Sequence, residues 1–229
     1  IENGKPYYKV ISNNEWVINK SPLGLVSEAV DYTQYLSIIG AETRQINETY
    51  TLPTGKKSTY VNNANELTIH LQTVAGQPFD IVFRVSDDGV AFRYVIPSQD
   101  GKSSIIIKDE ASAVYPTSFK YILGCKFASQ KSWPKNFPYE SYYGQYGSYG
   151  EYTDWNTAVT DASDPRFNEP VLIGTGNQNI LISEAENVGT YSISLLKAYT
   201  SPTGCLMWQH AGDSYQAYQT DVKNNLTVK

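Results

Sequence analysis

Apolar and polar residues alternate with a period of two along much of this chain, and this pattern restricts the fold more than any other feature. In "NELTIHLQ" (65–72), leucine and isoleucine fall on one side of an extended strand and polar residues on the other. Similar segments recur roughly every 10 to 12 residues with turn-forming residues between them, which is typical of β-sandwiches. Because no segment keeps a helical period, the sequence predicts an all-β fold.

Two tight hairpins are expected within this series of strands. Asn13 and Asn14 separate one pair of β-type segments, and Asp88 and Gly89 separate another. Asparagine, aspartate and glycine tolerate the backbone conformations that short hairpin loops need. Both sites are therefore predicted to be turns between antiparallel strands.

The composition gives no indication of a nucleic-acid-binding or membrane-spanning protein. The 229 residues are 41% hydrophobic and 18% charged, with a net charge of -5. No run of lysine and arginine indicates a nucleic-acid surface, and no stretch approaches the ~18 apolar residues of a membrane span. With no linker or repeat, residues 1–229 are predicted to form a single β-sandwich domain. The chain starts at Ile1 without a signal-type segment, so we expect a removed leader or a piece of a longer protein.

Residues 132–156 depart from the strand pattern. The segment "SWPKNFPYESYYGQYGSYGEYTDWN" is rich in tyrosine and is punctuated by glycines. Disordered segments are poor in aromatic residues, and long loops in compact domains are usually functional. The segment is predicted to be an ordered loop with a role in binding or packing.

Motifs of independent catalysis are absent from the sequence. It has two histidines, His70 and His210, without the spacing of a zinc site, and it has no nucleophile-elbow motif. The acids of 161–170 lack a calcium-loop pattern, and we interpret that segment as a turn. The two cysteines, Cys125 and Cys205, could form one disulfide, and the sequence leaves their pairing open.

One carboxylate lies on an apolar line. In "NILISEAENVG" (179–189), strand alternation puts Ile180, Ile182, Glu184 and Glu186 on the same side. An unpaired buried carboxylate is very costly. Glu184 must therefore reach water, a cation such as Arg84 or Arg93, or a metal ion, and the strand pattern does not choose among the three.

Three stretches together resemble a known family. They are "GKPYYKVISNNEWVINKSPLGL", "FDIVFRVSDDGVAFRYVIP" and "NEPVLIGTGNQNILISEAENVGTYSISL". In this order they resemble the N-terminal domain of glycoside hydrolase family 97, which contains α-glucosidases and α-galactosidases of gut Bacteroides-type bacteria. The resemblance implies a large β-supersandwich, similar to galactose mutarotase, that packs on a following (β/α)₈ barrel. The family's catalytic carboxylates lie on that barrel. The chain alone is therefore expected to be inactive.

The resemblance also implies roles for particular residues. Glu184 matches a glutamate that reaches across to the barrel and joins its carboxylates around a calcium ion, while Glu186 keeps a solvated role. Tyr139 and Glu140 are candidates for the wall of a cleft that binds α-linked oligosaccharide. The parent enzyme would be periplasmic or secreted. The alternative is a free-standing carbohydrate-binding module, which would bind sugar without the barrel. The choice between α-glucoside and α-galactoside, the stereochemical outcome and the oligomeric state stay open.

Overall fold

The structure, a computed structural model, describes residues 1–97, 105–126, 152–154, 166–185, 194–199, 205–210 and 227–228. Every regular element in these residues is a strand, and every sheet is antiparallel, so the predicted all-β class is confirmed. No helix of these ranges is long and apolar enough to cross a membrane. The chain divides into two compact units, residues 1–5 with 34–101 and residues 6–33 with 102–229. That residues 1–229 form one domain stays a prediction.

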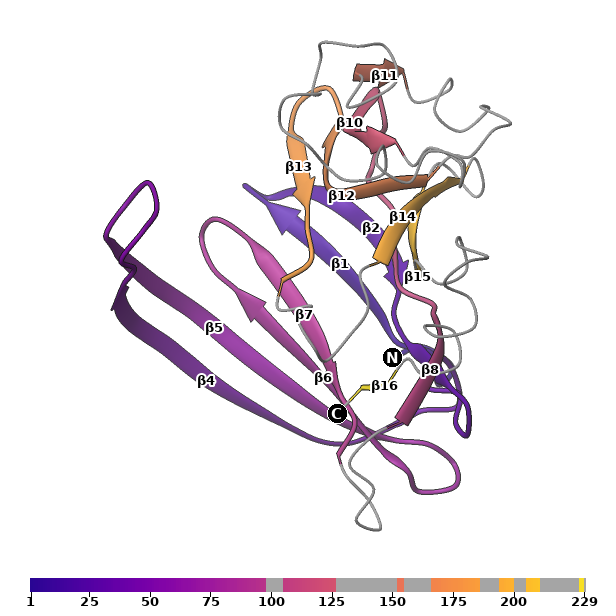
Figure 1. Cartoon of the computed structure of the whole chain (residues 1–229). Helices are drawn as coiled ribbons and strands as arrows, with labels where there is room; N and C mark the ends of the chain where they lie inside the picture. The colour runs from indigo at the N-terminus through magenta and orange to yellow at the C-terminus, as the bar shows by residue number, and fades with distance from the viewer. Residues whose placement is uncertain are drawn as a thin grey trace. The chain divides into compact units, whose positions relative to one another are not determined.

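The first unit is a four-stranded meander. Its strands are β4 (Ser37–Thr51), β5 (Thr59–Gln72), β6 (Pro78–Val85) and β7 (Val90–Val95). They lie in the order β4-β5-β6-β7, each hydrogen-bonded to its neighbour in sequence (Figure 1). The predicted hairpin across Asp88 and Gly89 is confirmed, since Val85 pairs with Val90 and the Ser86 N–H donates to the Gly89 carbonyl at 2.9 Å.

The predicted alternation of β5 and β6 is visible in their burial. Leu71 and Phe79 are fully buried and Ile81 is 2% exposed, and all three share one face of the sheet. On the same face the ring of Phe79 stacks on that of Tyr94 with centroids 5.3 Å apart. Apolar side chains at alternate positions thus build one face of this sheet, as the period of two requires.

Strand β4 was missing from the sequence prediction, which assigned no element to residues 40–51. The strand is long, yet only Ile46 is buried and nearly all its other residues are exposed. Its sequence "SIIGAETRQINETYT" carries few apolar residues at alternate positions. A strand exposed on both faces gives no hydrophobic alternation to detect.

The second unit begins with the other predicted hairpin. Strands β1 (Tyr7–Ser12) and β2 (Glu15–Pro22) pair antiparallel, and Ser12 faces Glu15 across the turn. Asn13 and Asn14 have φ angles of 51° and 64°. This left-handed conformation at both central residues is that of a two-residue turn whose twist matches the strands, so the prediction is confirmed.

The rest of the second unit contains two sheets. One has the order β16-β8-β3, and the other has the order β11-β10-β12-β14-β15-β9 with β13 also paired to β12 (Figure 1). The strands are β3 (Leu25–Ser27), β8 (Ile105–Glu110), β9 (Ala113–Val114), β10 (Tyr121–Lys126), β11 (Tyr152–Asp154), β12 (Arg166–Gly174), β13 (Asn179–Ile182), β14 (Ser194–Tyr199), β15 (Cys205–His210) and β16 (Thr227–Val228).

Two interpretations of loops need correction. The segment 161–170 was interpreted as a turn, but β12 already begins at Arg166, because its polar residues pair with β10 and β14. The segment 132–156 includes β11 near its end, and its remaining residues lie outside those described. Cys125 lies on β10 and Cys205 on β15, which are separated in the sheet by β12 and β14.

We expect Leu71→Ala to lower the free energy of unfolding by about 2–5 kcal/mol, because it removes a fully buried side chain and leaves a cavity. Val74→Ala is the matched control, since Val74 is 88% exposed in the adjacent turn and should change stability by less than about 0.5 kcal/mol. Urea unfolding followed by circular dichroism measures both. Equal effects of the two substitutions would contradict the difference in burial between the two side chains.

Candidate functional site

The hairpin of β12 and β13 positions the carboxylate that the sequence singled out. Val171 pairs with Ile182 and Gly174 with Asn179 along its ladder. In the turn, the Thr175 N–H donates to the Gln178 carbonyl at 2.9 Å, and Gly176 has a φ of 105° that favours glycine. This local geometry fixes the register in which the chain returns toward Glu184.

A tyrosine fastens the turn end of the hairpin to β10. Tyr121 pairs with Gly174, and its ring lies where a β-carbon on Gly174 would be, so only glycine fits beneath it. The ring crosses the glycine, and its hydroxyl donates to Asn179 Oδ1 at 2.6 Å on the next strand. An aromatic side chain covering a strand glycine in this way stabilises the register of three strands at once.

Buried apolar residues hold the opposite side of the hairpin. Val171 and Ile173 on β12 and Ile122 on β10 are fully buried, and Ile182 on β13 is 8% exposed. A strand whose last residue is packed in this way has little freedom at its end. The start of the segment that follows Ile182 is therefore held in a defined position.

Glu184 lies two residues beyond the end of β13, whereas the sequence prediction placed it inside the strand. The alternation nevertheless continues. Ser183 and Ala185 are exposed, whereas Glu184 is half-buried, on the same side as the half-buried Ile180 and the buried Ile182. The Ser183 hydroxyl donates to the backbone carbonyl of Glu184 at 3.3 Å, which restrains this short segment. The role of Glu184 as a metal ligand stays a prediction.

Glu169 is an acid on β12 that the sequence reasoning missed. Continuing the register of Val171 with Ile182 by two residues would set Glu169 opposite Glu184. Both carboxylate oxygens of Glu169 are buried. The signal was present in the spacing of the two strands about their turn, but it needed the register of the hairpin to be known.

The described residues form no complete metal site by themselves. Among them, no group of three or more histidine, cysteine, aspartate or glutamate side chains is placed to hold a metal ion. A half-buried carboxylate just past a fixed strand end suits a hard cation such as calcium, which takes oxygen ligands. Glu184 thus fits as one donor of a calcium site. Tyr139, Glu140 and Glu186 lie outside the described residues.

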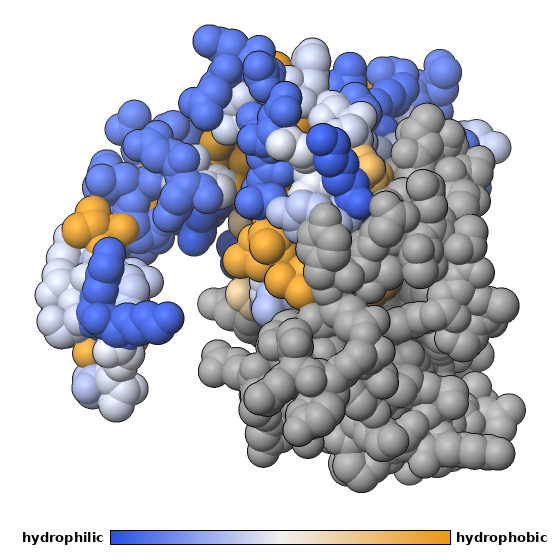
Figure 2. Space-filling model, turned by 90° about the horizontal axis from the view of Figure 1, so that it is seen from above, coloured by the Kyte–Doolittle hydropathy of each residue, from blue (hydrophilic) through white to orange (hydrophobic). Residues whose placement is uncertain are grey.

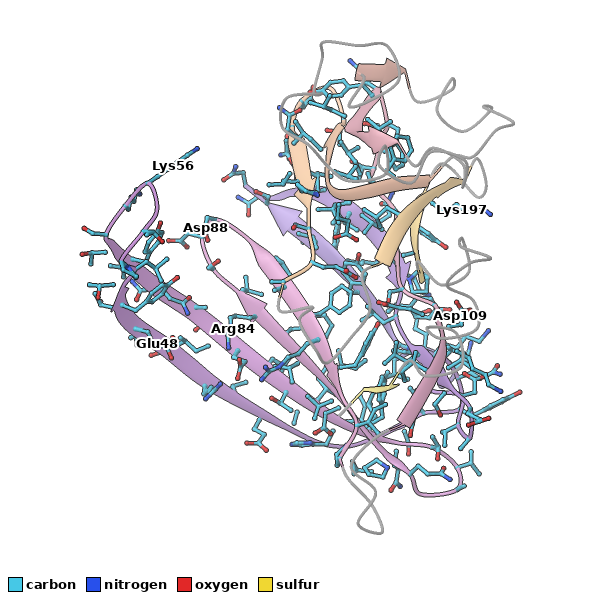
Figure 3. The ribbon with its side chains drawn as sticks, viewed as in Figure 1. Glu48, Lys56, Arg84, Asp88, Asp109 and Lys197 are labelled. Carbon is cyan, nitrogen blue, oxygen red and sulfur yellow. The ribbon has the colours of Figure 1, made fainter. Side chains whose placement is uncertain are left out.

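A second arrangement of charged groups lies on the first unit, on one face of its sheet. Glu66 on β5 is only 5% exposed and is bound from both neighbouring strands (Figure 3 labels Arg84). Arg44 Nε donates to its Oε1 at 2.5 Å, and Arg84 donates to its Oε2 at 2.7 Å. Hydrogen bonds from Arg44 and then Arg84 lower the pKa of Glu66 from 4.5 to about 2. Arg84, which the sequence offered as a cation for Glu184, thus binds the carboxylate of Glu66.

His70 on the same strand is also held between two carboxylates. Its Nδ1 lies 2.9 Å from Asp80 Oδ1 on β6, and its Nε2 lies 2.8 Å from Glu42 Oε1 on β4. Only the protonated ring donates from both nitrogens to two acceptors. Hydrogen bonds to Asp80 and then to Glu42 accordingly raise the pKa of His70. From the alternation alone, His70 is expected to face solvent without a partner. The structure instead places its ring in a bridge between Asp80 and Glu42.

Comparison with known proteins matches the chain to a domain found in glycoside hydrolases. A family model described as Glycosyl-hydrolase 97 N-terminal matches residues 1–227. A probable retaining alpha-galactosidase of Streptomyces bingchenggensis (strain BCW-1) is 34% identical over 108 residues, which are 47% of this chain and 16% of that protein.

Solved structures share the fold. A beta-arabinopyranosidase has a TM-score of 0.77 and 29% identity over 91% of this chain and 32% of its own. A glycoside hydrolase family 97 enzyme from Pseudoalteromonas sp. strain K8, in complex with acarbose, has a TM-score of 0.72 and 22% identity over 91% of this chain and 29% of its own. The chain thus spans about a third of the length of these solved relatives.

Glu66→Gln should change the response of the protein to acid. A carboxylate with a depressed pKa stabilises the fold above its unfolded value near 4.5 and loses that effect as the pH falls toward about 2. We expect the variant to be less stable at pH 7 by about 1–3 kcal/mol. Between about pH 4.5 and about pH 2 its stability should fall less steeply than that of the wild type. Urea unfolding across this range measures both effects, with the exposed Glu28→Gln as a control that should follow the wild type.

His70→Gln should act in the opposite pH range. A histidine with a raised pKa stabilises the fold fully below its unfolded value of 6.5, and the effect is lost as the pH rises through the folded pKa. Wild-type stability should therefore decline as the pH rises above about 6.5, and the variant should show a flatter dependence. Thermal unfolding at several pH values tests this, and parallel curves for the two proteins would refute the bridge.

Proposed function

The chain belongs to the Glycosyl-hydrolase 97 N-terminal family, and we propose that it is the non-catalytic N-terminal domain of a glycoside hydrolase acting on α-glucosides or α-galactosides. The match over residues 1–227 carries this proposal. The all-β fold shared with solved glycosidases supports it. The sequence has neither a nucleophile-elbow motif nor the histidine spacing of a zinc site, which agrees with a non-catalytic role.

We propose that the partner of this domain is a (β/α)₈ catalytic barrel of the same polypeptide. About two thirds of each solved relative lies outside the region matched by this chain, which leaves room for such a domain. The substrate class follows from the relatives' names, since one is a probable alpha-galactosidase and another is an enzyme seen with acarbose. An enzyme that meets such oligosaccharides would work in the periplasm or outside the cell.

Glu184 is proposed to donate one carboxylate to a calcium ion shared with the barrel. Support comes from its position, half-buried just beyond a strand that is packed and hydrogen-bonded to its end. Such a placement lets a side chain reach outward while its backbone stays fixed. Bound calcium would orient sugar hydroxyls and act as a Lewis acid. The role of Glu184 would be to supply one carboxylate oxygen to this ion from a fixed position.

A free-standing carbohydrate-binding module is the second candidate. It would use the aromatic segment 132–156, with Tyr139 and Glu140 as substrate contacts, and that segment is tyrosine-rich as sugar-stacking surfaces are. The two functions differ in one measurement. A module would bind α-glucans or α-galactosides as the isolated chain, whereas a domain that completes a barrel's site would bind them only in the full-length enzyme.

Glu184→Gln in the full-length enzyme should reduce activity steeply while keeping the fold, because it removes one charge from the proposed calcium shell. High calcium should partly restore the activity, since weaker binding is overcome by mass action. Hydrolysis of aryl glycosides at several calcium concentrations measures this, and Glu186→Gln serves as the matched control with little expected change. If both variants behave alike, Glu184 is not a calcium ligand.

The isolated chain provides an independent check of the shared site. Calcium takes roughly 6–8 oxygen ligands, which one carboxylate and water do not hold strongly. Calorimetric titration of the chain with calcium should therefore show weak or no binding. Tight binding to this chain alone would overturn the shared site.

A further inference from the structure

Strand β4 forms a long edge of the four-stranded sheet. In the described part of the chain it pairs with β5 alone, along its whole length from Ser37 to Thr51. The other edge of an outer strand presents a row of backbone N–H and C=O groups that can pair with another strand. On the face seen in Figure 2, the coloured residues are mostly hydrophilic, with hydrophobic residues at a few places. The edge is long enough for a specific interaction, and its side chains are of mixed polarity.

A bulge, one of the features that usually prevent an edge strand from pairing with another chain, is present at only one end of β4. A register shift between Ile38 and Gly40 marks a bulge at its start, and residues 41–51 pair regularly with β5 after it. The charges along this regular part are of both signs, with Glu42 and Glu48 on either side of Arg44. Edges protected from association generally carry charges that repel an approaching copy. On β4, whether the charges of two copies attract or repel one another depends on the register in which the two strands pair.

Two-fold antiparallel pairing allows only a few registers. Outward backbone groups occur on every second residue of an edge, so two copies pair about an axis through a residue. An axis at Gln45 would set Glu42 against Glu48, and an axis at Arg44 would set that arginine against its own copy. An axis at Thr43 would match Glu42 with Arg44, but the pairing would run through the bulge.

An axis at Ile46 is the favourable choice. It sets Arg44 of each copy opposite Glu48 of the other, so two cross-strand ion pairs form about the centre. It also sets Gln45 opposite Asn47 on the other face, where both side chains are exposed. All residues from 41 to 51 then lie in the bulge-free part of the strand. Axes at the neighbouring residues do not join opposite charges over this length.

The side chains needed for this pairing are accessible. Arg44 contacts Glu66 through its Nε, and 65% of its side chain is exposed. The exposed part of its side chain stays accessible to a carboxylate on a second copy, and arginine favours bidentate contacts with carboxylates. Glu48 is exposed on the same face and accepts from Asn62 at 3.3 Å (Figure 3). Both groups keep their contacts within the sheet when a copy approaches the edge.

We propose that β4 pairs antiparallel with β4 of a second copy about a two-fold axis at Ile46, which joins the two four-stranded sheets into one continuous sheet. The partner is a second copy of this chain because the match of charges is self-complementary. This inference is independent of the proposed glycosidase role, since it uses neither Glu184 nor a barrel.

Two double variants that differ only in sign test the register. Q45K/N47K places like charges opposite each other at both outer pairs, whereas Q45K/N47E places opposite charges there. Both change exposed residues outside the Arg44–Glu66–Arg84 contacts. The dimer dissociation constant, measured by sedimentation equilibrium, should rise about tenfold or more for Q45K/N47K. For Q45K/N47E it should equal or fall below that of the wild type.

Circular dichroism of both variants verifies that the fold is retained. A wild-type chain that stays monomeric throughout a concentration series overturns the proposal. Equal dissociation constants for the two variants also overturn it, because they would place the interface elsewhere. An open-ended assembly in place of a dimer would exclude the two-fold axis.

Discussion

The pairing of β12 on both of its edges fixes the position of the candidate ligand. On one edge it pairs with β10, and on the other it pairs first with β14 and then with β13. The change of partner falls next to Pro170, which has no N–H to give to either ladder. Glu169 lies at this junction, and the ladder with β13 ends at Ile182, two residues before Glu184. The change of partner thus leaves two acids, Glu169 and Glu184, outside the β12–β13 ladder, without disturbing the buried residues that hold β12.

The same electrostatic constraint has different solutions in the two units. A carboxylate removed from water needs cationic or hydrogen-bonding partners. Glu66 finds two arginines on adjacent strands, and its depressed pKa shows that the ionised form is the stable one. It is therefore a closed structural group. Glu184 lies past a strand end and is half-buried. Position along the strand separates a structural acid from a candidate ligand.

The sequence predicted those features that have a strong local cause. Alternation predicted β5 and β6, and the turn pairs Asn13–Asn14 and Asp88–Gly89 predicted two hairpins. Each of these signals depends on residues close in sequence. The sequence prediction missed β4, which lacks an apolar face, and it ended β13 too late, because the alternation of Glu184 continues past the last ladder contact. The partners of Glu66 and His70 come from strands distant in sequence, and only the register brings them together. Cross-strand contacts of this kind are set by the fold and leave no short-range signal.

The candidate ligand and the open edge belong to different compact units, and this separation matters for how the protein is studied. Glu184 depends on β12, β10 and the Tyr121 contact, whereas β4 depends on its ladder with β5 and on the arginines around Glu66. Substitutions at distant sites without shared partners have nearly additive effects. A variant of the β4 edge should therefore leave the backbone of the β12–β13 hairpin intact, and a variant of Glu184 should leave association unchanged.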